Sequence, residues 1–176
     1  KIYTHEKSGI LNLLDRVYRK DMFERFLYTV ANCEPINGRT FLDVGCGSGH
    51  YCVEVAKMGA SKVVGIDISE NMLQLCRQSA HREGVEDRCT FLHTDLLTYN
   101  SEELFDVTIG IGLFDYVSDP LPVLKRFRTV TRDRVIVSFP RVWTWRAPVR
   151  KLRLYLKGCD VNFYTKTDVA GLMKEA

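Results

Sequence analysis

The sequence predicts an α/β domain with a doubly wound, mainly parallel β-sheet. Short apolar runs rich in β-branched residues alternate with stretches in which apolar residues recur every three or four positions, the patterns of strands and helices in turn. One run, KVVGIDI at residues 62–68, is almost continuously apolar, as expected for a strand covered on both faces. Connections long enough to be right-handed crossovers then make the sheet parallel.

The composition limits the class of protein. The chain has 176 residues, 45% of them hydrophobic, which suits one domain with a core and excludes a disordered or fibrous chain. Six cysteines show no C-x-x-C pair and no histidine at ligand spacing, so we interpret them as reduced thiols and expect no metal site. No apolar run approaches the roughly 18 residues of a membrane span, and we predict a cytoplasmic protein.

The elements can be placed in order along the chain. Residues 7–31 read as one or two N-terminal helices, and strands are predicted at 40–44, 62–68, 89–93, 105–111 and 134–139. Helices are predicted at 51–58, from Ser69 as N-cap to near Gly84, from Asp119 as N-cap with Pro120 at the first helical position, and from Thr165. We expect strand and helix to alternate five times over.

The first strand breaks into three glycines at alternate positions, Gly45, Gly47 and Gly49. Glycine adopts positive φ and has no β-carbon, so a ligand can lie directly against backbone N–H groups at the start of the next helix, where the helix dipole favours a carboxylate or phosphate. A turn that only packs the helix onto the sheet would need one glycine. The stretch is therefore predicted to be a ligand-binding loop.

The glycine spacing argues against two common nucleotide motifs. The dinucleotide fingerprint G-x-G-x-x-G, started at either of the first two glycines, meets His50 or Cys52 at its last position, and no lysine follows the third glycine as a phosphate loop requires. An acid, Asp43, followed by G-x-G-x-G resembles the first motif of the class I S-adenosylmethionine-dependent methyltransferases. The resemblance implies the Rossmann-like methyltransferase fold, S-adenosylmethionine as methyl donor with S-adenosylhomocysteine as product, and cofactor contacts from Asp43 and the three glycines.

Acids also follow the next two strands. Asp67 lies 18 residues after Gly49, where a carboxylate beside the glycine loop can accept hydrogen bonds from both ribose hydroxyls of a nucleoside. The resemblance assigns that role to Asp67 and places Ile68 beside the cofactor. It further implies that Asp95 accepts from the adenine amine while the backbone N–H of Leu96 reaches a ring nitrogen.

The end of the fourth strand is where the resemblance places the methyl group. Gly110 and Ile111 would line the cofactor, and Asp115 and Tyr116 would face the substrate as catalytic candidates. An oxygen nucleophile of high pKa needs its proton removed, which these two residues, His5 or His50 could do, whereas a carboxylate or thiolate nucleophile needs no base.

The C-terminal part departs from the family pattern. Residues 143–157 combine two tryptophans with a basic, partly amphipathic helical pattern, where small-molecule methyltransferases usually have a substrate-covering insertion. Residues 125–157 contain eleven Lys or Arg and one acid. Two further strands that normally end the family's sheet cannot be found, so we expect a truncated chain or an abbreviated sheet.

We therefore predict a single S-adenosylmethionine-binding methyltransferase domain over residues 1–176, with an N-terminal helical lid (1–38), a cofactor-binding core (39–140) and a substrate-covering segment (141–165). It would transfer a methyl group by in-line displacement to a small-molecule acceptor, since GLFDYV stands where a nucleic-acid enzyme would have an N-P-P-Y-type tetrad. The segment rich in Trp and Arg favours an anionic or amphiphilic acceptor. Two alternatives remain open: a nucleic-acid methyltransferase using residues 125–157 as a basic track, and a non-catalytic module that binds S-adenosylmethionine.

Overall fold

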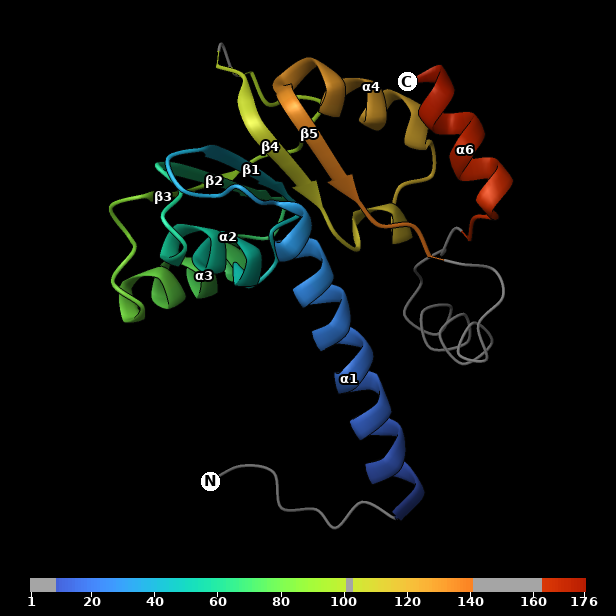
Figure 1. Ribbon diagram of the computed structural model, residues 1–176, viewed down its shortest axis with the longest axis horizontal. Helices are drawn as coiled ribbons and strands as arrows, with labels where there is room; N and C mark the ends of the chain where they lie inside the picture. Colours follow the sequence, from blue (N-terminus) through green and yellow to red (C-terminus); the bar gives the residue numbers. More distant parts are fainter. Residues whose placement is uncertain (1–8, 101–102, 141–162) are drawn as a thin grey trace. The chain divides into compact units, whose positions relative to one another are not determined.

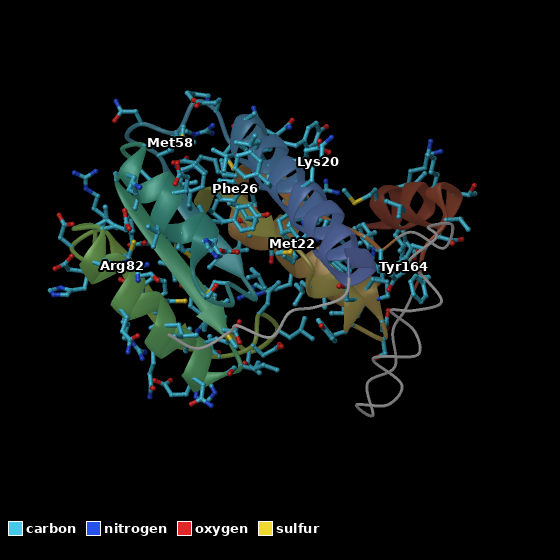
Figure 2. The ribbon with its side chains drawn as sticks, turned by 90° about the horizontal axis from the view of Figure 1, so that it is seen from below. Lys20, Met22, Phe26, Met58, Arg82 and Tyr164 are labelled. Atoms are coloured by element: carbon cyan, nitrogen blue, oxygen red, sulfur yellow. The ribbon has the colours of Figure 1, made fainter. Side chains whose placement is uncertain are left out.

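The computed structural model describes residues 9–100, 103–140 and 163–176, and the chain divides into two units, Lys1–Glu34 and Pro35–Ala176 (Figure 1). The first unit contains α1 (Gly9–Asn32), a single helix where the sequence predicted one or two. Lys20 and Glu24 pair across one turn of α1 at 3.7 Å, and Figure 2 labels Met22 and Phe26 on the same helix. The division into lid, core and covering segment stays a prediction.

The second unit is built on a five-stranded parallel sheet. Its strands are β1 (Thr40–Val44), β2 (Lys62–Asp67), β3 (Cys89–His93), β4 (Phe105–Gly110) and β5 (Thr131–Val137), in the order β3-β2-β1-β4-β5. All four pairings are parallel. The chain moves outward from β1 to β3 and then returns to the other side of β1 to form β4, so the strand order reverses between β1 and β4. This confirms the doubly wound sheet.

Helices cover both faces of the sheet (Figure 1). On one face, Leu42 of β1 and its β2 partner Val64 pack in a core cluster with residues of α4 (Pro120–Val130). On the other face, Asp43 pairs in register with Gly65, and a β-carbon on Gly65 would lie 3.0 Å from the sulfur of Cys52 on α2 (His50–Lys57). Helix α3 (Glu70–Arg82) lies on this second face, whereas α6 (Lys166–Glu175) packs beside α4.

The three predicted N-cap residues, Ser69, Asp119 and Thr165, all stand directly before their helices, but only the last two cap them with their side chains. The Asp119 carboxylate accepts from the Leu121 N–H at 3.3 Å with Pro120 at the first helical position, and Thr165 forms a capping box at the start of α6. Ser69 precedes α3, but its side chain makes no capping hydrogen bond. Its backbone N–H instead donates to the Asp67 carboxylate at 2.8 Å, so the acid caps this turn.

Two expectations for connections and strand bounds are wrong. The described residues between β3 and β4 form a turn in place of a helix, because the backbone carbonyl of Asp95 accepts from the N–H groups of Thr98 and Tyr99 and its carboxylate accepts from Leu97. The fifth strand begins at Thr131, three residues before the prediction, directly after α4. Its polar first half is held by side chains, as the Thr131 hydroxyl lies 2.6 Å from that of Thr108 on β4.

Aromatic rings join the ends of β4 and β5 to the start of α6. Phe114 stacks on Phe139 with ring centroids 4.5 Å apart, and Tyr164, labelled in Figure 2, meets Phe139 edge-on at 5.1 Å. The Tyr164 N–H donates to the Pro140 carbonyl at 2.9 Å. The described residues that flank 141–162 therefore meet beside the end of β4, while the predicted basic helix at 143–157 lies outside the described residues.

Candidate functional site

The candidate site lies where the strand order reverses, at the carboxyl ends of β1 and β4. Open α/β sheets bind ligands at this place because the loops after the two strands diverge to opposite faces. Here the loops stay close together, since a β-carbon on Gly45 after β1 would lie 3.4 Å from the side chain of Leu113 after β4. Leu113 belongs to a short 3-10 helix, Leu113–Asp115, that follows Gly112.

The three glycines of the loop have positive φ, with values of 68° at Gly45, 54° at Gly47 and 80° at Gly49, but different surroundings. A β-carbon on Gly47 would meet no atom within 4 Å, so this position opens onto space that a ligand can fill. A β-carbon on Gly49 would lie 3.0 to 3.3 Å from three atoms of Cys76 on α3. Gly47 therefore leaves room for a ligand to approach the backbone, whereas Gly49 is required by the packing of the loop on α3.

Asp67 ties the glycine loop to the turn after β2. One carboxylate oxygen accepts from the Gly47 N–H at 2.9 Å and the other from the Ser69 N–H at 2.8 Å. A carboxylate has about four acceptor positions, so two remain for hydroxyl donors such as those of a ribose. The next side chain, Ile68, is 75% exposed and forms an apolar surface beside this carboxylate, while its carbonyl lies 2.8 Å from Nε2 of His93.

Asp43 lies beneath the loop and not in the open space. Its side chain is 2% exposed, faces α2, and accepts from the Cys52 thiol at 3.3 Å. Burial raises the pKa of Asp43 to about 7; the Cys52 hydrogen bond opposes the rise and the negative charge of Asp67 adds to it. A positive charge bound above the loop would favour the ionised form of this carboxyl group, which would then lose its proton.

The residues predicted to hold the adenine lie after β3. Asp95 is exposed, and one of its carboxylate oxygens accepts from the Leu97 N–H at 2.8 Å, which leaves acceptor positions for a ligand. The side chain of Leu96 is 3% exposed and belongs to the core cluster on the α4 face. Only the backbone of Leu96 is thus suited to contact a ligand.

The residues after β4 differ in their surroundings. Gly110 is buried, and a β-carbon there would lie 2.6 Å from the ring of Phe127, so packing alone requires this glycine. Ile111 is half-buried. Asp115 is 5% exposed. Burial of Tyr164 raises the pKa of its hydroxyl, and the negative charge of Asp115 adds to the rise. Tyr116 is 62% exposed.

The structure describes one of the two histidines that the sequence offered as a general base. His50 is the exposed first residue of α2. His5 lies outside the described residues.

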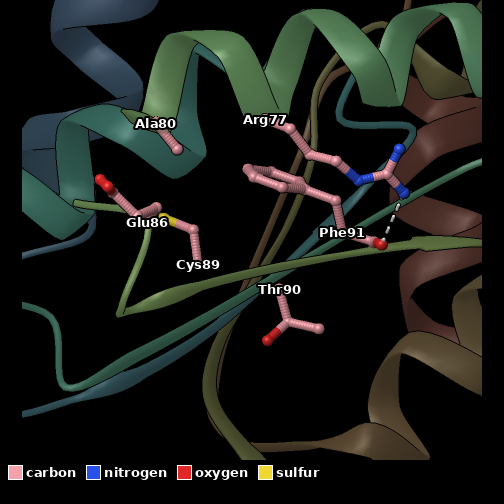
Figure 3. Close-up of a pocket in the computed structure, with 6 residues that line it drawn as sticks. All are labelled: Arg77, Ala80, Glu86, Cys89, Thr90 and Phe91. Carbon is pink, nitrogen blue, oxygen red and sulfur yellow. Dashed lines mark hydrogen bonds between the residues drawn. The ribbon is translucent and has the colours of Figure 1, made fainter. Parts of the chain in front are cut away.

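A hollow of about 320 Å³ opens elsewhere, between α3 and the edge strand β3 (Figure 3). It is lined by Arg77, Ala80, Glu86, Cys89, Thr90 and Phe91. Arg77 donates to the Phe91 carbonyl at 3.3 Å across it. No residue predicted for the cofactor or the acceptor lines this hollow.

Sequence reasoning missed four residues that shape the site. Leu113 lies over Gly45, the Ser138 hydroxyl accepts from the Gly112 N–H at 2.9 Å, His93 contacts the Ile68 carbonyl, and Cys76 supports the glycine loop. Ser138 directly follows an apolar strand, a signal that could have placed it at this edge of the sheet. For Cys76 the sequence shows only a small apolar residue on the buried side of a helix.

The fold combines a parallel sheet whose strand order reverses with a glycine loop at the reversal, the arrangement of α/β domains that bind nucleotides. A family model described as a methyltransferase domain matches residues 36–173. The chain belongs to this methyltransferase domain family, which confirms the resemblance seen in the sequence.

Known relatives agree with this assignment. Magnesium protoporphyrin IX methyltransferase from Synechocystis PCC 6803, solved with bound S-adenosylhomocysteine, superposes with a TM-score of 0.74 at 18% identity, covering 98% of this chain and 78% of that one. An S-adenosylmethionine-dependent methyltransferase from Mesorhizobium loti gives a TM-score of 0.68 at 22% identity, covering 84% and 77%. Ribosomal protein L11 methyltransferase from Salmonella newport is 47% identical over 53 residues, which is 30% of this chain and only 18% of that relative.

Within residues 9–100, 103–140 and 163–176, no three His, Cys, Asp or Glu side chains are grouped so as to hold a metal ion. No described helix has the length and apolar character needed to cross a membrane.

Proposed function

We propose that this chain transfers a methyl group from S-adenosylmethionine to a small-molecule acceptor. The observation that supports the proposal most strongly is the open position above Gly47, whose own N–H is held by the Asp67 carboxylate at 2.9 Å. A backbone that a ligand can approach and a carboxylate suited to ribose hydroxyls thus lie side by side at the reversal of the sheet. These residues fit the cofactor that the family uses.

The remaining residues have assigned parts in this proposal. Gly45, Gly47 and Gly49 form the loop around the methionine end, with Asp43 beneath it as an acid that can answer the positive charge. Asp67 and Ile68 hold the ribose and one side of the adenine, and Asp95 with the backbone of Leu96 holds the adenine edge. Gly110 and Ile111 border the cofactor at the end of β4.

S-adenosylmethionine supplies a methyl group already activated on a sulfonium. The chain's own residues then have to exclude water and hold the acceptor nucleophile in line, about 3 Å from the carbon under attack. Asp115 and Tyr116, on the loop after β4, are the catalytic candidates for removing a proton from a hydroxyl acceptor. Tyr116 is exposed whereas Asp115 is buried, so of the two Tyr116 is the more accessible to an acceptor.

A small molecule is the acceptor class that we favour. The Synechocystis structure, which covers nearly the whole chain, is named for a small-molecule acceptor, magnesium protoporphyrin IX. The basic region at 125–157, with Arg146, Arg150 and Arg153 outside the described residues, suits an anionic or amphiphilic molecule. Replacing these three arginines with neutral residues should weaken acceptor binding and leave cofactor binding intact.

The cofactor is tested by calorimetric titration with S-adenosylhomocysteine. Gly47→Ala should abolish binding, because its methyl group fills the open space, while folding stability falls by only about 1 kcal/mol from the left-handed backbone. Gly84→Ala is the matched control: its φ is 67° and its added carbon also meets nothing within 4 Å, but it lies at the end of α3. Equal binding by the two variants would contradict the site.

Activity is tested with a methyl-labelled donor and a panel of acceptors. Transfer to anionic or amphiphilic small molecules is the expected result. Transfer to RNA or DNA, with an affinity that falls steeply with salt, would favour the nucleic-acid alternative. Binding without transfer to any acceptor would favour the non-catalytic module.

A further inference from the structure

The glycine loop rests on a single buried thiol of α3. Cys76 is fully buried, and its Sγ donates to the carbonyl oxygen of Gly47 at 2.9 Å. The same sulfur lies 3.8 Å from the sulfur of Cys46, and Gly49 packs so closely on it that a β-carbon there would lie 3.0 Å away. Three successive parts of the loop therefore touch one residue of a helix that begins more than twenty residues later.

This contact fixes the direction of one peptide plane in the loop. The carbonyl of Gly47 and the N–H of Ser48 belong to the same planar trans peptide unit and point in opposite directions. Because the Gly47 carbonyl points to Cys76 on α3, the Ser48 N–H of the same peptide unit must point away from Cys76. The unit before it is fixed as well, since the Gly47 N–H donates to Asp67 at 2.9 Å.

The thiol is suited to this work as a donor. Contact with Cys46, together with burial, raises the pKa of Cys76 above the range of an ordinary thiol, so the sulfur keeps its proton at neutral pH. The neighbouring thiol of Cys52 has a different partner, because it donates to the Asp43 carboxylate at 3.3 Å. Cys76, in contrast, donates to the backbone of the glycine loop.

We propose that Cys76 is a positioning residue for the cofactor loop: its thiol orients the Gly47–Ser48 peptide so that the loop presents an N–H to the ligand. This inference rests on the proposed function, in which the loop binds S-adenosylmethionine. Cys76 touches no ligand itself, and it acts through the backbone of Gly47.

The test compares variants of Cys76 with matched controls. Cys76→Ala removes the donor and should weaken S-adenosylhomocysteine binding about fivefold to tenfold, the effect of one hydrogen bond. Cys76→Ser keeps a donor and should restore affinity to within about threefold of the unchanged chain. Cys89→Ala removes a thiol outside the loop, and Leu73→Ala makes a larger cavity on the same helix; both should leave the affinity unchanged, even where the melting temperature falls.

Titrations are made well below the melting temperature of every variant. Cys76→Ala binding as tightly as the unchanged chain would overturn the inference, and so would equal losses in Cys76→Ala and Leu73→Ala, or a failure of Cys76→Ser to recover.

A second readout needs no ligand. Hydrogen exchange of the backbone amides at 45–50 should be faster in Cys76→Ala than in the unchanged chain and unaltered in Cys89→Ala. If the unchanged chain failed to bind S-adenosylhomocysteine, the proposed function would fall, whereas the exchange rates would still decide whether Cys76 orders the loop. Unaltered exchange in Cys76→Ala would overturn that role.

Discussion

Replacing Asp43 with asparagine should remove a pH dependence from the folding stability of this chain. Burial raises the pKa of Asp43 from 3.8 to about 7. Between these values the folded chain holds a proton that the unfolded chain has released, so stability falls as the pH rises from about 4 to 7 and is level above that. Each pH unit is worth about 1.4 kcal/mol, so the loss at pH 8 is about 4 kcal/mol.

The assay is urea unfolding of the ligand-free chain and of Asp43→Asn, followed by circular dichroism under reducing conditions at pH 5, 6, 7 and 8. Asparagine stays neutral, and its carbonyl can still accept from Cys52. The stability of the variant relative to the unchanged chain should therefore rise by about 3 kcal/mol between pH 5 and pH 8, on top of a constant offset. A difference that is level over this range would refute the reasoning.

Asp106→Asn is the control, because the pKa of Asp106 is shifted in the opposite direction from that of Asp43. The pKa of Asp106 is lowered, first by the Thr40 backbone N–H and then by the Thr40 hydroxyl and Arg132. Its stabilising contribution is complete above its ordinary pKa near 4 and is lost only as the pH falls through the lowered value. Asp106→Asn should therefore be less stable than the unchanged chain by the same amount at all four pH values.

Two further substitutions test the packing around the site. Gly49→Ala should lower the free energy of unfolding by about 3 kcal/mol, measured by thermal or urea unfolding, because the added β-carbon would meet the backbone of α3 at Cys76. Gly84→Ala, where φ is also positive but the added carbon meets nothing within 4 Å, should lower it by about 1 kcal/mol, and equal losses would contradict the close approach at Gly49. Gly110→Ala should lower stability by about 2 kcal/mol through contact with the Phe127 ring, and by clearly less in a Phe127→Leu background, where a loss of the same size would contradict the contact.

The sequence predicted those parts of the site that depend on neighbours in the chain. The glycine loop and Asp67 could be found because glycine spacing and an acid at a strand end are local signals, and parallel strands bring their ends together. The same reasoning assigned Asp43 and Gly110 to the cofactor site, and that assignment stays a prediction. The structure adds what the sequence did not show, that Asp43 is covered by α2 and that packing against Phe127 requires a glycine at 110.

The sequence did not show two kinds of feature. One is contacts between residues far apart in the chain, and the other is the polar start of β5, which side-chain hydrogen bonds join to β4. Cys76 meets Gly47 across 29 residues, and Leu113 meets Gly45 across a still longer separation. The start of β5 was missed because Thr131 and Arg132 have no apolar pattern, although Arg132 pairs with Asp106 at 2.8 Å. The helix expected between β3 and β4 is replaced by a turn that Asp95 closes with its own carbonyl and carboxylate.

The pairing of β1 with β4 has a consequence for the order in which the chain folds. Thr40 donates to Asp106 across 66 residues, while β1 to β3 pair over much shorter separations with single helices between them. Contacts that close long loops form late, because the entropy of closure must be met before they contribute. The half of the sheet with the glycine loop can thus form first, and the candidate site is completed only when β4 pairs with β1. A ligand that spans both loops would bind the finished sheet alone, so it should slow unfolding more than it speeds folding.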